Sequence, residues 1–303
     1  MKKLYWKAID KKIYYSNMIK KSIGTDIEYI DLFYMASKTL IYRAQNDFNP
    51  FLQYVHMLNI LQQDKDIQNG LEIGGGYSTI VLSKLIFDNN CKITSIDINP
   101  DKYKSILPDK KYRNKLFSLI NIVEDLTIDY NTMVDFYKNT LEKELSRYNA
   151  DELQKHILKF TSDFKGGYVD LKTDPLEYLF KDNKLNLFDK VLTNDVLERE
   201  KGFYQMFDKV QKKGYVNTIL ENNIIYDFIF FDCGELSSIV EWILLEKQIK
   251  TGGYAILHDI YFPKSIKNFL VGALISISDE WEIVYKDTSS VQGMLIARKM
   301  GIK

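Results

Sequence analysis

The sequence predicts an α/β protein with a doubly wound, mostly parallel sheet that ends in an antiparallel hairpin. Three observations predict this class. From Gly70 onward, short apolar runs alternate with helical stretches, as in repeated strand–helix–strand units. A glycine-rich turn separates the first apolar run from the helix that follows it. The last two runs, at 282–285 and 293–297, are only a few residues apart, too few for a crossover between parallel strands.

The individual elements follow from the length and spacing of these runs. Strands of the parallel part are expected at 71–73, 92–96, 117–123, 228–231 and 254–257. Helices are expected between them, notably at 78–87 and 237–249. Each strand is short and apolar, which is typical of strands buried on both faces of a sheet.

Two further regions are expected to be mostly helical. Residues 1–66 are rich in aromatic side chains and place apolar residues, such as those at 32–41, at helical spacing. Residues 126–215 interrupt the alternation and carry helix-start signals at Asn149 and Asp174-Pro175. The predicted organisation is an N-terminal helical region (1–66), a sheet domain (67–125 and 216–303) and a helical insertion (126–215). The sequence leaves open whether the insertion is a lid over a site, an interface or both.

Composition argues against a nucleic-acid partner. Lys+Arg and Asp+Glu both number 41, so the formal net charge is zero and gives no long-range attraction to phosphate backbones. The sequence also lacks interleaved aromatic and basic residues, the pattern that binds single strands. The lysines at 209, 212 and 213 are interpreted as a solvated helix face.

The apolar stretches, the N-terminus and the cysteines predict a cytoplasmic protein with no membrane partner. The most apolar stretch, 224–231, has the length of a strand and is interrupted by Asp227, so it is not expected to span a bilayer. The basic N-terminus has no apolar segment of the kind found in secretory signals. Cys91 and Cys233 are expected to be buried, reduced thiols.

The glycine-rich turn predicts a cofactor site. Gly74, Gly75 and Gly76 lie between a short strand and an amphipathic helix, where a tight turn and a ligand close to the backbone both favour glycine. Thr79 stands where a dinucleotide fingerprint needs glycine, and a carboxylate at Glu72 would repel a pyrophosphate. Glu72 instead suits a cationic cofactor such as S-adenosylmethionine. No Gly-Lys-Ser/Thr follows, which excludes a P-loop.

Acidic residues also end the second and third predicted strands. Asp97 follows Gly76 by 21 residues, which is the position of an acid that accepts hydrogen bonds from a cofactor ribose. Asp125, after the third strand, is expected beside the adenine of the cofactor. A turn cap at Asp97 and a solvated loop at Asp125 are the alternatives.

These residues carry a resemblance to a known family. Residues 72–78, Glu-Ile-Gly-Gly-Gly-Tyr-Ser, look like motif I of class I S-adenosylmethionine-dependent methyltransferases, acid-x-Gly-x-Gly-x-Ser/Thr. Residues 226–232 resemble the fourth-strand motif of that family. Residues 250–259 resemble its Lys-Pro-Gly-Gly turn and fifth strand, with Thr251 in place of proline. The resemblance covers about half of the chain. It implies an enzyme with a Rossmann-like, seven-stranded sheet and a bound S-adenosylmethionine. The expected cofactor-binding residues are Glu72, Gly74, Gly75, Gly76, Ser78, Asp97 and Asp125.

Three further residues mark the expected site of reaction. Asp232 ends the fourth predicted strand, and His258-Asp259 end the fifth. Ligands of doubly wound sheets bind beyond the carboxyl ends of the strands, so these side chains should face the cofactor. Two roles remain open. Asp232 and Asp259 can hold Mg²⁺, which lowers the pKa of a bound hydroxyl, or His258 can act as a general base.

The resemblance extends to the small-molecule and sugar O-methyltransferases, with two departures. Catechol-type members have asparagine after the fifth-strand acid, where this chain has Ile260. Sugar-modifying members often read Asp-Gly-Asp-His after the fourth strand, where residues 232–235 read Asp-Cys-Gly-Glu. Glu235 thus holds the histidine position and is expected to act with His258 and Asp232. With these departures, the resemblance leaves both roles open, Mg²⁺ binding by Asp232 and Asp259 and general-base catalysis by His258.

The expected function is methylation of a hydroxyl on a small molecule or a sugar. The fourth strand is not followed by the Asn/Asp-Pro-Pro-Tyr/Phe sequence of amino-methylating members. An NAD-type oxidoreductase is disfavoured by Thr79 and by the terminal hairpin. A catalytically inactive Rossmann-like scaffold and, less favoured, a nucleic-acid methyltransferase are the remaining alternatives. Self-association into a homo-oligomer stays open.

Overall fold

The computed structural model describes residues 49–161, 177, 179–181, 184–186, 194–207, 214–262, 264–287 and 292–301. Their contacts form two compact units. The first unit contains the described residues before Asn69, with Gly75–Ile93 and Asp101–Asn121. The second, called the sheet unit below, contains Asn69–Gly74, Thr94–Pro100 and the described residues from Ile122 onward. The helical spacing at 32–41, the start signal at 174–175 and the three lysines at 209, 212 and 213 lie outside the described residues.

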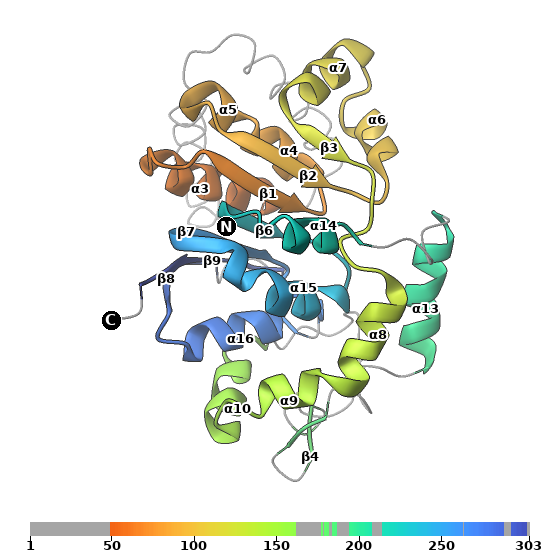
Figure 1. Ribbon diagram of the computed structural model, residues 1–303, viewed down its shortest axis with the longest axis vertical. Coiled ribbons are helices and arrows are strands. Elements are labelled where there is room, and N and C mark those ends of the chain that lie inside the picture. The colour runs from red at the N-terminus through yellow and green to blue at the C-terminus, as the bar shows by residue number, and fades with distance from the viewer. Residues whose placement is uncertain are drawn as a thin grey trace, which may run out of the picture. The chain divides into compact units, whose positions relative to one another are not determined.

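Within the described residues, seven strands form one sheet in the order β3-β2-β1-β6-β7-β9-β8 (Figure 1). The β1–β6 and β6–β7 pairs are parallel, and the β7–β9 and β8–β9 pairs are antiparallel. The predicted doubly wound sheet with a C-terminal antiparallel hairpin is therefore confirmed. The strands are β1 (Asn69–Ile73), β2 (Lys92–Ile96), β3 (Asn121–Val123), β6 (Tyr226–Phe231), β7 (Ile249–His258), β8 (Trp281–Lys286) and β9 (Met294–Lys299).

Strand β6 shows why this sequence forms the centre of the sheet. All six of its residues are buried, as expected for a parallel strand covered on both faces. Gly70 of β1 faces the Phe228 ring so closely that a Cβ atom at Gly70 would lie 2.1 Å from it. The one charged residue of β6, Asp227, accepts a hydrogen bond of 2.6 Å from the Asn69 backbone and pairs with Lys250.

Three of the predicted elements need correction. The strand expected at 117–123 is wrong over its first residues, because α7 (Lys110–Leu119) continues to 119 and β3 begins at 121. The helix expected at 78–87 is two helices, α4 (Tyr77–Leu82) and α5 (Lys84–Asn89), with Ser83 between them. The helix expected at 237–249 ends earlier, as α15 (Ser237–Leu245) and a 3₁₀ turn, η2 (Glu246–Gln248). Short apolar runs do not distinguish a strand from the end of a helix, which explains the first error.

The other described helices fall into the two units. The first unit contains α3 (Asn49–Gln63), α4, α5, α6 (Tyr103–Ile106) and α7. The sheet unit contains α15 and the helices α8 (Tyr130–Asn139), α9 (Leu141–Leu145), α10 (Ala150–Leu158), α13 (Asn194–Gln205), α14 (Tyr215–Glu221) and α16 (Phe269–Ile277). The 3₁₀ turn η1 (Pro100–Lys102) spans the boundary between the two sets of residues. None of the described helices has both the length and the apolar character needed to cross a membrane.

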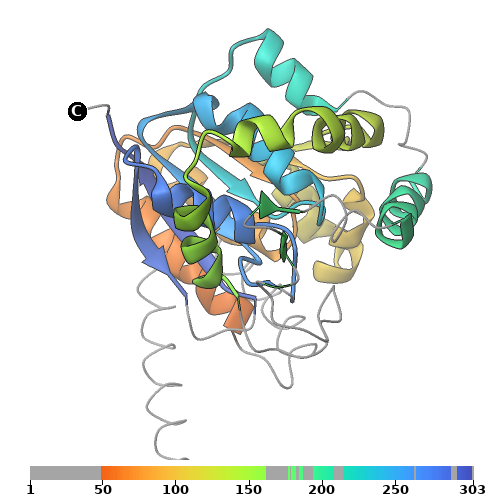
Figure 2. The same ribbon diagram turned by 90° about the horizontal axis from the view of Figure 1, so that it is seen from below.

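The described part of 126–215 packs with the sheet unit. Its described residues form helices and one short antiparallel pair, β4 (Phe180–Lys181) and β5 (Lys184–Leu185). Asn149 caps α10 as expected, since its Oδ1 accepts hydrogen bonds from the backbone of Asp151 and Glu152. Helices α14, α15 and α16 lie side by side (Figure 1), and α10 lies against α16 (Figure 2).

One hydrophobic core joins these helices to the sheet. It contains inward-facing residues of β1, β6 and β7, such as Leu71, Phe231 and Leu257, and apolar residues of α8, α10, α15 and α16. The intervening residues of β6, among them Phe228 and Phe230, are also buried on the opposite face. This burial makes the central strands rigid and fixes their carboxyl ends, where the predicted reactive residues lie.

The packing of α16 against the residues that directly follow α10 depends on a glycine. A Cβ atom at Gly272 would lie 2.7 Å from the Phe160 ring, whereas a Cβ at Gly202 of α13 would meet nothing within 4 Å. We expect Gly272→Ala to lower the free energy of unfolding by about 1–3 kcal/mol, the usual cost of overpacking. The control Gly202→Ala should be neutral or stabilising by up to about 1 kcal/mol, because alanine is the better helix former. Urea denaturation of both variants measures the difference. Equal free energies of unfolding for Gly272→Ala and Gly202→Ala would contradict the close packing of Gly272 on the Phe160 ring.

Candidate functional site

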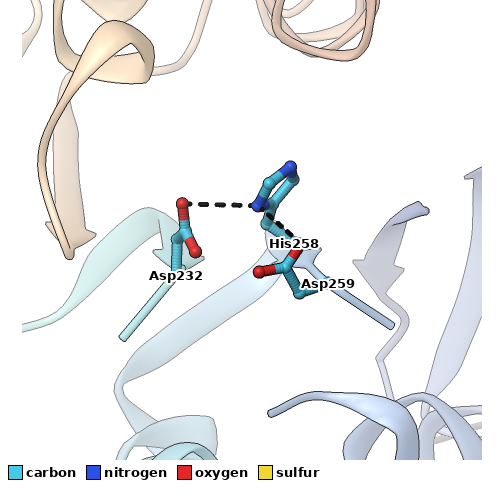
Figure 3. A group of neighbouring side chains, drawn as sticks. All are labelled: Asp232, His258 and Asp259. Atoms are coloured by element: carbon cyan, nitrogen blue, oxygen red, sulfur yellow. Dashed lines mark ion pairs between the residues drawn. The ribbon is translucent and has the colours of Figure 1, made fainter. Parts of the chain in front are cut away.

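The three predicted reactive residues meet at one edge of the sheet. Strands β6 and β7 are parallel neighbours, with Phe231 paired to Leu257. Asp232, His258 and Asp259 therefore come together at their carboxyl ends. The Nδ1 atom of His258 lies 3.3 Å from Asp232 Oδ2 and 3.4 Å from Asp259 Oδ1. Figure 3 shows this ring nitrogen facing both carboxylates, while the other ring nitrogen points away from them. His258 and Asp259 are buried, so the imidazole is held in one position.

A lysine that the sequence did not single out completes this cluster. The Nζ atom of Lys267 lies 3.0 Å from Asp232 Oδ1 and 3.0 Å from Asp259 Oδ2. Each carboxylate thus gives one oxygen to the imidazole and the other to the ammonium. We call Asp232, His258, Asp259 and Lys267 the charge cluster.

Asn268, next to Lys267, fixes the two strand ends that carry the cluster. Its side-chain Nδ2 donates hydrogen bonds to the backbone oxygens of Phe231, at 3.1 Å, and His258, at 2.6 Å. The side chain is fully buried. A buried amide that holds both strand ends at once keeps Asp232 and His258 at a constant separation. Asn268 is therefore a positioning residue.

Asp259 has a backbone conformation that supports its place in the cluster. Its φ angle is 57°, in the left-handed region that non-glycine residues rarely adopt, although aspartate tolerates it better than most. Its backbone N–H donates to Gly293 O at 3.1 Å. Gly293 packs on the Tyr261 ring, where a Cβ atom would lie 2.3 Å away. Non-glycine residues in the left-handed region occur often at functional sites. Asp259 turns the chain directly after β7.

The charges of the cluster stabilise one another. Burial alone would raise the pKa of Asp232, but the nearby Lys267 and His258 outweigh it and hold this pKa well below its usual value. Burial would lower the pKa of His258, but Asp232 and Asp259 outweigh it and raise this pKa. The same two carboxylates, with Glu235, raise the pKa of Lys267 against the effect of its burial. The cluster therefore favours ionised Asp232 and protonated Lys267.

Glu235, which was predicted to be catalytic, has its partners outside the charge cluster. Its Oε2 accepts hydrogen bonds from Ser265 Oγ at 2.9 Å and from the Ile266 backbone at 2.8 Å. Burial raises the pKa of Glu235, and Lys267 partly opposes this shift. The contacts suit a residue that anchors the segment leading to Lys267, and a direct part in the reaction stays a prediction.

Four of the predicted cofactor residues belong to the sheet unit. Glu72 is fully buried and accepts a hydrogen bond of 2.6 Å from Ser95 Oγ. Gly74 has a φ angle of 83°, and a Cβ atom there would lie 1.8 Å from Asp232 O. Asp97 is 4% exposed and its Oδ1 accepts from the Asn99 backbone at 2.8 Å. Asp125 Oδ1 accepts from the Leu126 backbone at 2.8 Å. The tight turn predicted at Gly74 is thus confirmed, and it lies directly against Asp232.

The other three predicted cofactor residues, Gly75, Gly76 and Ser78, belong to the first unit. The Gly76 backbone N–H donates to Thr79 Oγ1 at 2.7 Å, and this oxygen also lies 2.7 Å from the Tyr103 hydroxyl. A Cβ atom at Gly76 would meet nothing within 4 Å. Gly75 and Ser78 are buried. Space beside the bare backbone of Gly76 is what a glycine that admits a ligand requires.

The charge cluster does not fit a bound Mg²⁺. Among the described residues, Asp232, His258 and Asp259 are the group whose donor atoms all lie within 4.8 Å of one another. Mg²⁺ prefers oxygen ligands, but one oxygen of each carboxylate already faces the Lys267 ammonium. A cation bound to both carboxylates would have to displace that ammonium.

The chain is similar to solved structures of methyltransferases. The O-methyltransferase from Bacillus cereus, in complex with S-adenosylhomocysteine, is 12% identical over 91% of this chain and 92% of that chain, with a TM-score of 0.42. The O-methyltransferase TomG from Streptomyces achromogenes, involved in tomaymycin synthesis and solved with S-adenosylmethionine, is 11% identical over 99% of this chain and 100% of that chain, with a TM-score of 0.45.

The methyltransferase PaMTH1 from Podospora anserina, bound to S-adenosylhomocysteine, is 10% identical over 97% of this chain and 96% of that chain, with a TM-score of 0.45. No family model and no curated protein matches the sequence. A likeness at this level assigns no function, so the function is argued from the chain's own residues.

Proposed function

We propose that this chain is an S-adenosylmethionine-dependent methyltransferase that methylates a hydroxyl of a small molecule or a sugar. The observation that carries the proposal is the imidazole of His258 between two carboxylates, at the carboxyl ends of β6 and β7. Ligands of doubly wound sheets bind at this edge.

The cofactor half of the proposal rests on the glycine turn and on Asp97. Gly74 makes the turn in contact with Asp232 O, and Gly76 leaves space beside its backbone. Asp97 follows β2, the position at which an acid accepts hydrogen bonds from ribose hydroxyls. S-adenosylmethionine, when bound, supplies the sulfonium methyl group.

The residues of the charge cluster suit the removal of a proton from the acceptor hydroxyl. Both carboxylates lie close to Nδ1 of the ring, and Nε2 is directed away from them (Figure 3). The Nε2 atom of neutral His258 can then take the proton of an acceptor hydroxyl. As the proton leaves, the hydroxyl oxygen forms a bond to the methyl carbon and the bond from carbon to sulfur breaks. The products are a methyl ether, S-adenosylhomocysteine and protonated His258.

The inactive-scaffold alternative accounts poorly for the charge cluster. Buried charges are costly to desolvate, and a site without chemistry gains little from them compared with apolar residues. Here two carboxylates, an imidazole and an ammonium lie together at the carboxyl ends of β6 and β7. Asn268 holds these two strand ends through hydrogen bonds to their backbone oxygens. A nucleic-acid acceptor has no comparable support, since the chain carries no net charge.

The general-base role predicts how the reaction depends on pH. Because Asp232 and Asp259 raise the pKa of His258, His258 should lose its proton only above its ordinary value of about 6.5. The rate of methyl transfer should therefore rise with pH through this raised pKa. Asp232→Asn removes one carboxylate charge, so it should shift the rise to lower pH.

Transfer of a labelled methyl group from S-adenosylmethionine to a panel of hydroxylated small molecules and sugars tests the proposal. We expect a methyl ether as product, a rate that is lost in His258→Ala, and the Asp232→Asn shift described above. The exposed Asp101 provides a control, and Asp101→Asn should behave like the unmodified chain. A product methylated on nitrogen, or full activity of His258→Ala, would refute the assignment.

A further inference from the structure

We propose that the ammonium of Lys267 takes the place of a divalent metal ion in the charge cluster. The exclusion of metal rests on the geometry of the cluster alone. The consequence for the acceptor, that its oxygen is held without Mg²⁺, rests on the proposed function.

The ammonium lies where a cation shared by the two carboxylates would lie. Its Nζ is 3.0 Å from one oxygen of Asp232 and 3.0 Å from one oxygen of Asp259. The other oxygen of each carboxylate faces His258 Nδ1. A divalent ion bound to these carboxylates would stand within a few ångströms of the ammonium, a distance at which like charges in a protein site repel one another strongly.

The chain anchors Lys267 on both sides. Before it, the Lys267 backbone N–H donates to Ser265 Oγ at 3.1 Å, and Ser265 and Ile266 both donate to the Glu235 carboxylate. After it, the side chain of Asn268 is bonded to the ends of β6 and β7. The Lys267 side chain is only 17% exposed. The ammonium is therefore built into the site, unlike that of a mobile surface lysine.

The position of the ammonium also suggests what it does for an acceptor. An ammonium has three N–H donors, and those of Lys267 that the described residues engage go to Asp232 and Asp259. Within the described part of the chain this leaves one donor for an acceptor oxygen, which the fixed positive charge would stabilise as the proton leaves. Lys267 thus provides a positive charge and an orienting hydrogen bond. A metal ion in a catalytic site likewise stabilises charge and orients the substrate.

Titration with Mn²⁺, followed by the loss of its free-ion electron paramagnetic resonance signal, tests the exclusion directly. The unmodified chain should bind Mn²⁺ no more tightly than the millimolar range. Lys267→Met keeps the length of the side chain and removes the charge, and it should bind Mn²⁺ at least tenfold more tightly. Lys267→Arg keeps the charge and should behave like the unmodified chain. Adding Asp259→Asn to Lys267→Met should reverse the gain.

Thermal unfolding of each variant confirms that it is folded, and Lys267→Gln gives a second uncharged side chain if Lys267→Met does not fold. Micromolar binding of Mn²⁺ by the unmodified chain would overturn the proposal. So would the absence of any gain in a folded Lys267→Met or Lys267→Gln. Binding of S-adenosylhomocysteine, measured on the same samples, reports on the proposed function separately. A failure of the metal exclusion can therefore be distinguished from a failure of the proposed function.

Discussion

Replacing Gly74 with alanine should reduce the free energy of unfolding by about 2–5 kcal/mol. Two costs add. The φ angle of 83° is in the left-handed region, where a Cβ atom costs about 1–2 kcal/mol. That atom would also lie 1.8 Å from Asp232 O, which is backbone and cannot turn aside. Overpacking of this kind costs about 1–3 kcal/mol or more. Urea denaturation at neutral pH measures the loss, which is a large part of the stability of an ordinary domain.

Gly76→Ala is the matched control, because the same change two residues later should not destabilise the fold. The φ angle of Gly76 is 161°, which is extended backbone, and a Cβ atom there would meet nothing within 4 Å. If a cofactor approaches this bare backbone, the added methyl group should weaken the binding of S-adenosylhomocysteine at least tenfold. A Gly74→Ala variant as stable as Gly76→Ala would contradict the contact with Asp232. Unchanged affinity in Gly76→Ala would contradict the role of the glycine turn.

Glu241→Gln should remove a pH-dependent loss of stability of up to about 3 kcal/mol. Glu241 of α15 is 1% exposed, and burial raises its pKa to about 7 from the ordinary 4.5. Cys233 Sγ donates to its carboxylate. A group whose pKa is raised on folding contributes stability that is fully present below its unfolded pKa and is lost as pH rises through its folded pKa. Each pKa unit corresponds to about 1.4 kcal/mol.

The unmodified chain should therefore lose stability between about pH 5 and pH 8, and Glu241→Gln should lose less over the same range. Urea denaturation at several pH values gives both curves. The raised pKa of His258 adds a loss of the same sign, but that loss is common to both proteins and cancels in the difference. Glu282→Gln, at an exposed position of β8, is the control and should follow the unmodified chain. Parallel curves for Glu241→Gln and the unmodified chain would show that Glu241 is ionised in the folded state without cost.

The sequence predicted those site residues that directly follow apolar runs. Asp232 and His258-Asp259 end β6 and β7, and the ends of parallel neighbours meet whatever the details of packing. Gly74 was predictable because a tight turn with a left-handed residue favours glycine. The charge cluster was thus foreseen in three of its four members.

Lys267 and Asn268 were not predictable from the pattern. They lie in the segment between β7 and α16, and Lys264 in the same segment was equally placed. The anchoring of this segment by Glu235 before Lys267, and by Asn268 after it, brings Lys267 to the carboxylates. The role expected of Glu235 illustrates the same limit, because its position after β6 gives no indication that its hydrogen bonds go to Ser265 and Ile266.

Isothermal titration of the protein with S-adenosylmethionine and S-adenosylhomocysteine tests the proposed cofactor site directly. We expect micromolar binding of both compounds to the unmodified chain. Binding should be lost in Asp97→Ala, whose carboxylate is expected to hold the ribose, and kept in Asp101→Ala, at an exposed position nearby in the sequence. No detectable binding of either compound to the folded protein, or equal binding by Asp97→Ala, would contradict a cofactor site at the glycine turn and Asp97.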